Sequence, residues 1–411
     1  MDRISFNEIE VNKLSTIDEV GFVFSWSGRI FRAINKKSED AVRDMFDSGL
    51  VAKLIENKFI SNTWISEYSL DNVNLILEHE KITHVTYPQE WSFSMLQDAA
   101  ILVSELNQFL AKYEYQLKDC HGYNILFDKI SPVFVDFGSI IKIPNKYNRF
   151  LCLGEFMSFY YYPLKIWSRG SFYLANAIIN HSSIKVMSYQ DGAILTNRFL
   201  FRIKGIVEFY KKLRKKLKIN KIDWMLFSKI DYKSLINQIK KPKYTTEWKN
   251  YHDEFFTKEG SVIYGKDRFN RILELIQSFP DIKSILEVGG NQGIVSQLIS
   301  EKTEIKDIVC TDYDEQAVDL MYLRLKKILN KNITPVIINF IYPYVNNFEL
   351  SPTVRFKSDA VLALALTHHL LITQKIDIDY LMNVISDYTN KYAFIEFMPL
   401  GLWDGNTALV V

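Results

Sequence analysis

The chain has 411 residues, of which 48% are hydrophobic and 24% are charged. This composition is typical of globular proteins and excludes a largely disordered chain, and the length predicts two or three domains. Fifty basic residues against 48 acidic residues leave a net charge of +2. Such a balance excludes a dedicated nucleic-acid binder, whose surface carries a strong excess of positive charge.

The cysteines and the apolar segments indicate the cellular compartment in which the protein is expected. Cys120, Cys152 and Cys310 are far apart, odd in number and without CxxC spacing, which favours a reducing compartment without disulfides or structural zinc. We therefore expect a cytoplasmic protein. The opening residues, MDRISFNEIEVNK, lack the apolar segment of a signal peptide, and no later stretch has the roughly 18 apolar residues of a membrane-spanning helix.

The first 148 residues combine strands and helices. Residues 17–36 predict two strands joined near Gly28, and residues 38–56 have the apolar periodicity of a helix. A strand-like NLILEHE follows, then the hinge-like YPQEW, and then a long helix from about Ser94 to Lys112.

A polar loop after this helix has the spacing of a phosphoryl-transfer site. Asp119 stands five residues before Asn124, and Asp136-Phe137-Gly138 follows twelve residues later. In kinase-type phosphoryl transfer the first Asp accepts the hydroxyl proton, whereas the Asn and the second Asp hold the metal ions that bridge the phosphates. With the order of elements upstream, residues 1–148 resemble a kinase-like module, which implies nucleotide and Mg²⁺ as ligands.

The same module departs from an active kinase at the phosphate-binding end. No clear glycine-rich loop precedes residue 29, and no strand carries a lysine in a V-A-I-K-like context. Lys36, Lys37 and Arg32 are the candidate phosphate contacts. Because positioning and charge neutralisation are most of this catalysis, we favour a scaffold or ligand sensor over an active kinase.

Residues 149–242 read as a helical extension and linker. The segment 150–167 is rich in aromatic residues, but Glu155 and Pro163 interrupt it, so a buried helix is favoured over a membrane span. Residues 202–221 contain nine basic residues and one acidic residue, with apolar residues at helical spacing. This predicts a basic amphipathic helix, packed inward with a solvated face or, alternatively, in peripheral contact with anionic lipid or a charged glycan.

From residue 243 onward helices and strands alternate regularly, after a polar, proline-containing connection, KKPKYTTEWKN. Apolar strands separated by helices predict an α/β fold with a doubly wound parallel sheet. Strands are expected at 284–288, 307–312, 334–340, 359–366 and 392–398, and helices at about 266–278, 293–302, 315–330 and 377–390.

The segment SILEVGGNQG carries the strongest functional signal. Its strand runs into Glu287, and glycines then allow a sharp turn and a close approach of the backbone to a ligand at the start of a helix. The residues of this turn are Gly289, Gly290, Asn291 and Gly293. The next strand ends in Asp312, 25 residues after Glu287, where a carboxylate can bind both hydroxyls of a ribose.

A glycine-rich turn by itself would suit a dinucleotide equally well. Here Asn291 stands where a dinucleotide fingerprint has the glycine that makes room for pyrophosphate, so a ligand without pyrophosphate is favoured. Acidic residues at the ends of the first two strands suit S-adenosylmethionine, whose amino group and sulfonium are positive and whose ribose needs a carboxylate.

Residues 284–398 resemble a class I S-adenosylmethionine-dependent methyltransferase, and the resemblance implies that Asn339 faces the adenine. LALALTHHL and FIEFMP, with YPQEWSFSMLQDAA and LKDCHGYN upstream, are similar to a subgroup of large bacterial methyltransferases related to a nodulation methyltransferase. In that subgroup the first part is a kinase-related module. The resemblance implies methyl transfer to an acceptor, a hydroxyl of a carbohydrate or of a small metabolite.

Two histidines follow the fourth strand, where the reactive methyl group is presented in such folds. His368 or His369 could take the proton of the acceptor hydroxyl, with Glu396 orienting it or sharing the work. The alternative is that one histidine packs and the other caps a loop. We expect no metal site here, because adjacent histidines point to different sides and one carboxylate seldom completes a coordination shell.

Two other functions stay open: a phosphotransferase centred on Asp119, Asn124 and Asp136 with a regulatory second half, and a non-catalytic scaffold.

The chain also has only 13 residues after YAFIEFM, too few for the helix and hairpin that normally complete a class I methyltransferase sheet. We therefore expect a truncated chain, or one completed by a partner strand, with an exposed sheet edge that invites homo-oligomer formation.

Overall fold

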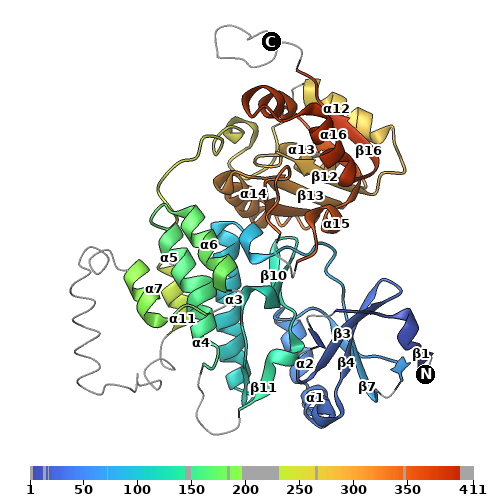
Figure 1. Cartoon of the computed structure of the whole chain (residues 1–411), viewed down its shortest axis with the longest axis vertical. Helices are drawn as coiled ribbons and strands as arrows, with labels where there is room; N and C mark the ends of the chain where they lie inside the picture. Colours follow the sequence, from blue (N-terminus) through green and yellow to red (C-terminus); the bar gives the residue numbers. More distant parts are fainter. Residues whose placement is uncertain are drawn as a thin grey trace. The chain divides into compact units, whose positions relative to one another are not determined.

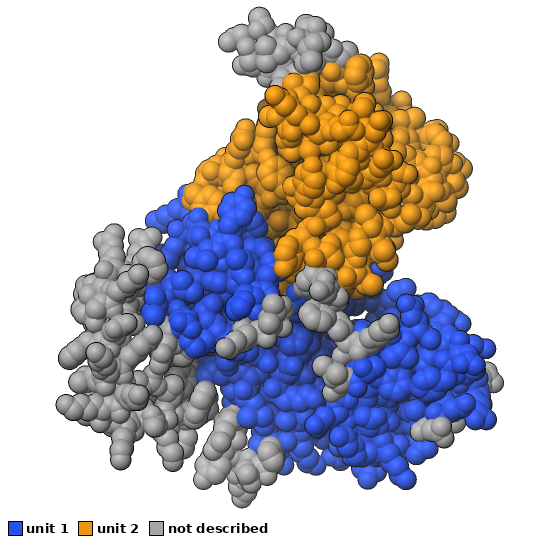
Figure 2. All heavy atoms as spheres, in the orientation of Figure 1, with its two compact units in different colours: residues 1–83, 96–126, 132–243 blue, residues 84–95, 127–131, 244–411 orange. Residues whose placement is uncertain are grey.

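The computed structural model describes residues 3–12, 15–16, 18–71, 73–143, 150–182, 186–196, 231–263, 267–345 and 349–398. The chain forms two compact units, which Figure 2 colours separately. Unit 1 consists of Met1–Thr83, Leu96–Leu126 and Pro132–Lys243, and unit 2 of His84–Met95, Phe127–Ser131 and Tyr244–Val411.

This grouping differs from the expected division into 1–148, 149–242 and 243–411. The aromatic segment after residue 149 packs within unit 1, where the Tyr160 hydroxyl donates to the Cys120 carbonyl at 2.9 Å and the Cys120 N–H donates to Glu155 at 2.7 Å. Two short segments upstream belong to unit 2 instead. The expected basic helix at 202–221 lies outside the described residues.

Unit 1 contains a five-stranded sheet of order β2-β3-β4-β7-β5, in which all neighbours are antiparallel (Figure 1). Ser27 and Gly28 join β3 to β4 with φ values of 50° and 75°, the left-handed conformation that a two-residue hairpin turn requires. The expected hairpin within 17–36 is therefore present. The strands of this sheet are β2 (Glu10–Val11), β3 (Gly21–Trp26), β4 (Arg29–Ile34), β5 (Thr63–Ile65) and β7 (Leu75–His79), and β1 (Arg3–Ile4) pairs separately, in parallel, with β6 (Ser69–Leu70).

The expected helix at 38–56 is divided into two. Gly49 has a φ of 71°, and a left-handed residue ends a helix, so α1 (Glu39–Asp47) and α2 (Leu50–Glu56) are separate. The long helix is present as α3 (Phe93–Ala111). Further along, the helices are α4 (Leu153–Phe156), the π-helix η7 (Met157–Tyr161), α5 (Tyr162–Trp167), α6 (Phe172–Ser182), α7 (Tyr189–Thr196) and α11 (Tyr232–Asn237).

The aromatic segment 150–167 is a core element. Phe156, Phe159, Tyr160 and Trp167 are all at most 2% exposed, so the prediction of burial is confirmed. Within the described ranges, no helix is long and apolar enough to cross a membrane.

Two strand pairs flank the polar loops of unit 1. β8 (Tyr115–Leu117) pairs with β11 (Ile140–Lys142), and β9 (Ile125–Asp128) pairs with β10 (Ser131–Phe134). The loop between β8 and β9 carries Asp119, and Asp136 follows β10.

Unit 2 contains a fully parallel sheet of order β14-β13-β12-β15-β16 (Figure 1). The strands are β12 (Ser284–Val288), β13 (Asp307–Asp312), β14 (Ile333–Ile337), β15 (Ser358–Ala363) and β16 (Thr389–Ile395). The helices are α12 (Asp267–Gln277), α13 (Ile294–Lys302), α14 (Glu315–Lys327), α15 (Pro352–Arg355) and α16 (Ile378–Asp387). The predicted α/β class with a parallel sheet is confirmed.

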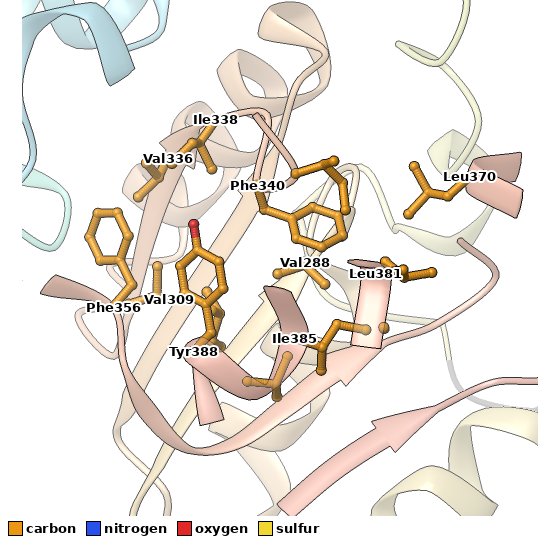
Figure 3. Close-up of a cluster of buried hydrophobic side chains, with 14 residues drawn as sticks. Val288, Val309, Val336, Ile338, Phe340, Phe356, Leu370, Leu381, Ile385 and Tyr388 are labelled. Atoms are coloured by element: carbon orange, nitrogen blue, oxygen red, sulfur yellow. The ribbon is translucent and has the colours of Figure 1, made fainter. Parts of the chain in front are cut away.

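Alternation along β12 assigns its side chains to the two faces of the sheet. Leu286 and Val288 join a buried cluster with Leu381 and Ile385 of α16, which Figure 3 shows together with Tyr388. Glu287 points to the opposite face and contacts α13. Helices therefore cover both faces of the sheet, and the polar loops gather at the carboxyl ends of its strands.

Two segments from the first half of the chain complete unit 2. The Glu90 carboxylate pairs with both terminal nitrogens of Arg355, and both side chains are at most 4% exposed. Ser92 donates to Asp319 at 2.8 Å. Trp91 packs edge-on against Phe127. The motif YPQEW is thus a structural part of unit 2.

Candidate cofactor-binding and catalytic site

The loop after β12 turns through three left-handed residues. Gly289, Asn291 and Gly293 have φ values of 65°, 51° and 71°, a conformation that glycine and asparagine adopt more readily than other residues. A Cβ atom at Gly293 would also lie 2.6 Å from the sulfur of Met321, and one at Gly290 would lie 2.5 Å from the sulfur of Cys310. The glycines therefore permit both the turn and its close packing on β13 and α14.

Glu287, the last-but-one residue of β12, is buried and bonded within the protein. Its Oε2 accepts hydrogen bonds from the backbone N–H of Ser296, at 3.0 Å, and from the Ser296 hydroxyl. Burial raises the pKa of this carboxyl group. Glu287 thereby fixes the first turn of α13 against the sheet. The N–H groups of that turn lie next to the glycine-rich loop.

Asp312 ends β13 and connects the two adjacent loops. Its Oδ2 accepts the N–H of Asn291 at 2.7 Å, and its Oδ1 accepts the N–H of Asp314 at 2.8 Å. Burial raises the pKa of Asp312 to about 6. The backbone N–H of Tyr313 also stabilises the ionised form; a carboxylate has about four acceptor positions, so at least one is left for a further donor.

The side chain of Asn291 offers one more acceptor at this point. Its Nδ2 donates to the carbonyl of Trp248 at 2.8 Å, whereas its Oδ1 is buried without a hydrogen-bond partner in the described part of the chain. A buried acceptor without a donor is costly. The ammonium and ribose hydroxyls of S-adenosylmethionine are donors, so the acceptor set of Asn291 and Asp312 fits that cofactor.

Residues 244–253, here called the strap, are held against these loops by hydrogen bonds. Asp314 accepts the Thr246 hydroxyl at 2.7 Å and the Trp248 N–H at 3.2 Å. Gln292 donates to the Lys249 carbonyl at 2.8 Å and to Asp253 at 2.7 Å. Sequence reasoning treated this segment only as a connection.

The two histidines follow β15 in a short helical segment. The rings of His368 and His369 are 4.1 Å apart between centroids, and the His369 ring lies edge-on to Trp248 of the strap at 5.3 Å. Burial lowers the pKa of both imidazoles, and the neighbouring His369 lowers that of His368 further. Both are therefore neutral near pH 7 and able to accept a proton.

Glu396 follows β16 and fixes the loop that leads to the histidines. Its carboxylate pairs with Arg268 and accepts the N–H of Ala365 at 2.7 Å. Its carbonyl accepts the Thr367 hydroxyl at 3.0 Å. The geometry is that of a positioning residue.

Asn339 lies beyond the end of β14 and is exposed. Its Oδ1 accepts the N–H groups of Ile341 and Tyr342 at 3.1 and 3.2 Å, which caps a turn. The Asn339 side chain therefore stabilises this turn, and a contact with adenine would be a role in addition to that one.

The second candidate site lies in unit 1. Asn124 donates to Asp119 at 3.3 Å, so the first two residues of the motif are adjacent. Asp136 is bonded elsewhere: Oδ1 accepts from Arg32 at 3.0 Å, and Oδ2 accepts from Ser139. With both oxygens engaged and one of them neutralised by a guanidinium, Asp136 does not fit the role of a metal ligand in this conformation. Among the described residues, no group of three His, Cys, Asp or Glu is arranged to hold a metal ion.

Glu155 is a member of this site that sequence reasoning missed. Burial, reinforced by a hydrogen bond with Asp119, raises the pKa of Glu155 to about 8. The Glu155 carboxyl therefore keeps its proton near neutral pH and can donate it in that hydrogen bond. The two residues lie 36 positions apart in the sequence, so no motif spacing could have paired them.

Comparison with known proteins gives one curated relative. Over 420 aligned residues the chain is 22% identical to the nodulation protein NoeA of Rhizobium meliloti strain 1021, covering 93% of this chain and 83% of that protein. No family model matches the chain.

Similar solved structures include the methyltransferase domain of a bacterial Hen1 (17% identity, TM-score 0.22, 28% of this chain and 55% of that one). The bifunctional kinase-methyltransferase WbdD is another (14% identity, TM-score 0.26, 37% and 36%). A third is Haemonchus contortus phosphoethanolamine N-methyltransferase 2 bound to S-adenosylmethionine (15% identity, TM-score 0.25, 36% of this chain and 34% of that one). The chain spans about half or less of the length of these three structures. The predicted similarity to a nodulation protein is thus confirmed over nearly the whole chain.

Proposed function

We propose that the protein transfers the methyl group of S-adenosylmethionine to a hydroxyl oxygen of a carbohydrate or small metabolite. One observation carries the proposal: at the carboxyl ends of β12 and β13, Asp312 is hydrogen-bonded to the glycine-rich loop beside the unpaired acceptor of Asn291. An acidic, donor-poor site at this point of a parallel sheet suits a cationic ligand that carries a ribose.

The cofactor would supply an electrophilic methyl group on a sulfonium. We assign its ribose to Asp312 and its ammonium to the loop at Asn291, with Trp248 of the strap beside them. We assign its adenine to the end of β14, near Asn339. Glu287 supports the site indirectly, because it fixes α13.

For the chemical step we assign His369 or His368 as the base. When bound, the cofactor would supply its methyl group to the acceptor oxygen and leave as the neutral thioether, and the imidazole would take the proton of the acceptor hydroxyl. His369 is the stronger candidate, since its ring contacts Trp248 next to the loop. Glu396 keeps the preceding loop in position.

Isothermal titration calorimetry with the purified chain tests the cofactor. We expect S-adenosylmethionine and S-adenosylhomocysteine to bind, and NAD to bind more weakly or not at all. Tighter binding of NAD than of S-adenosylmethionine would overturn the proposal.

For unit 1 we propose a ligand-sensing or scaffolding role rather than phosphotransfer. The engagement of Asp136 by Arg32 supports this choice, because catalysis requires that carboxylate to hold a metal ion.

A further inference from the structure

Trp248 of the strap contacts the loops that follow three strands of unit 2. Its backbone N–H donates to Asp314 at 3.2 Å, and its carbonyl accepts from Nδ2 of Asn291 at 2.8 Å. Its indole forms a side-chain hydrogen bond with the hydroxyl of Tyr313, and its ring lies edge-on to that of His369, 5.3 Å away between centroids. One residue thus joins the loops after β12, β13 and β15.

These contacts fix the direction of the Trp248 ring. Both hydrogen-bonding groups of its backbone and the single polar atom of its ring have partners, and only two side-chain torsions connect them. Asp314 is itself held in place, because it also accepts the N–H groups of Gln316 and Ala317 at 3.0 Å and so caps α14. The ring of Tyr251 packs edge-on to that of Trp248 at 5.6 Å.

His369 is the residue that this arrangement affects. Its ring contacts those of Trp248 and His368. Burial lowers the pKa of His369, and the negative charge of Glu247 in the strap opposes this change. Burial and the neighbouring His369 lower the pKa of His368, and Glu396 opposes that change. An indole ring beside an imidazole takes the place of water, which solvates the protonated form best, so the contact favours the neutral base.

We propose that Trp248 is a positioning residue for the base of methyl transfer. Its indole ring holds the imidazole of His369 in one orientation at the carboxyl ends of the strands and excludes water from one side of it. The hydrogen bonds to Asn291, Tyr313 and Asp314 relate that orientation to the loops that we assign to the cofactor. Trp248 takes no proton in this role. The inference rests on the proposed function, because a positioned base requires that His369 acts in methyl transfer.

Titration of the histidine signals by nuclear magnetic resonance, with the full chain and no ligand, tests the contact. The His369 signal is the one that His369→Gln removes. We expect the pKa of His369 to rise toward its ordinary value of about 6.5 in Trp248→Ala, because water replaces the ring. Trp248→Phe keeps an apolar ring and should restore most of the low value. Trp64→Ala is the matched control: it removes an exposed tryptophan of unit 1 and leaves His369 unchanged.

Carbethoxylation by diethyl pyrocarbonate measures the exposure of the same imidazole independently. At about pH 8 the ring is neutral in every variant, so the rate of modification reports access rather than charge. Mass spectrometry of the peptide that contains His369 should show several-fold faster modification in Trp248→Ala than in the natural chain. Tyr313→Phe keeps the indole but removes its hydrogen-bond partner, and it should speed the modification to a smaller extent.

Circular dichroism confirms that each variant is folded, and Tyr313→Phe decides the matter if Trp248→Ala does not fold. An unchanged pKa or an unchanged modification rate of His369 in folded Trp248→Ala overturns the proposal, as do equal changes in Trp64→Ala. Calorimetry of the natural chain with S-adenosylhomocysteine keeps the two possible failures apart. A chain that does not bind this compound contradicts the proposed function, whereas a chain that binds it and shows no effect of Trp248 contradicts only the positioning role.

Discussion

The raised pKa of Asp312 predicts a specific dependence on pH. In the folded protein this pKa is about 6, against an ordinary value of 3.8, because the carboxyl is buried. The folded state thus holds the proton more tightly, so the contribution of this group to the free energy of unfolding is greatest below pH 4 and is lost as the pH rises through 6. Ligand-free protein should become less stable across that window.

Cofactor binding should change in the opposite direction. The ribose hydroxyls need the ionised carboxylate as acceptor, so affinity for S-adenosylmethionine should rise between pH 5 and pH 7. Asp312→Ala should weaken binding at pH 7.5 by about 2 kcal/mol, the loss of charge-assisted hydrogen bonds. Calorimetry at several pH values measures both effects, and Asp312→Asn should show no pH dependence. A pH-independent affinity in the natural chain would remove Asp312 from the cofactor site.

The histidines give a second prediction for single side chains. His369→Ala should lower kcat about 100-fold while affinity for S-adenosylmethionine is preserved, as expected of a lost general base. His368→Ala is the matched comparison, because the two rings are in contact and only one of them takes the proton. Full activity in both variants would exclude histidine from the mechanism.

The site residues at the strand ends could be predicted from the sequence, but their hydrogen-bond partners could not. Asp312 and the glycine-rich turn stand at a spacing that the alternation of strand and helix dictates. Asp314 and Trp248 form a hydrogen bond across 66 positions. Arg32 was one of three candidate phosphate contacts, but only the folded chain shows it between Asp18 and Asp136, which is 104 positions away.

Among the elements, the strands of unit 2 were predictable because continuous apolar runs between helices indicate the buried strands of a parallel sheet. β12 and β13 begin and end where the sequence indicated. The helix at 38–56 was less predictable, since its apolar periodicity continues past Gly49, where the backbone turns left-handed. YPQEW was also misjudged: as a hinge it would be exposed, yet Glu90 is buried in unit 2.

The pair of Glu90 and Arg355 makes the role of that segment testable. Both side chains are buried, so removing one partner leaves an uncompensated charge. Arg355→Ala should lower the free energy of unfolding by about 3–5 kcal/mol, whereas the double change Glu90→Leu with Arg355→Met should restore most of the loss. Urea denaturation followed by circular dichroism measures both. Lys391→Ala, in an exposed ion pair, is the control and should change stability by less than about 1 kcal/mol.

The path of the chain as a whole predicts how it unfolds. It passes between the two units five times, after residues 83, 95, 126, 131 and 243. Two domains joined by one linker unfold independently, but here the short segments 84–95 and 127–131 of unit 2 are connected at both ends to unit 1. Unfolding either unit therefore frees the ends of segments that complete the other, and the two transitions should be coupled.

Differential scanning calorimetry of the full chain tests this coupling. We expect one transition, and S-adenosylmethionine should raise its Tm as a whole, because a ligand that binds only the folded state stabilises everything that unfolds with its site. A fragment starting at residue 244 lacks Trp91 and Phe127, which pack on each other, and Ser92, which bonds Asp319. It should therefore be unfolded or aggregated. Two separate transitions, of which the cofactor shifts only one, together with a folded 244–411 fragment, would show that the shared segments do not couple the units.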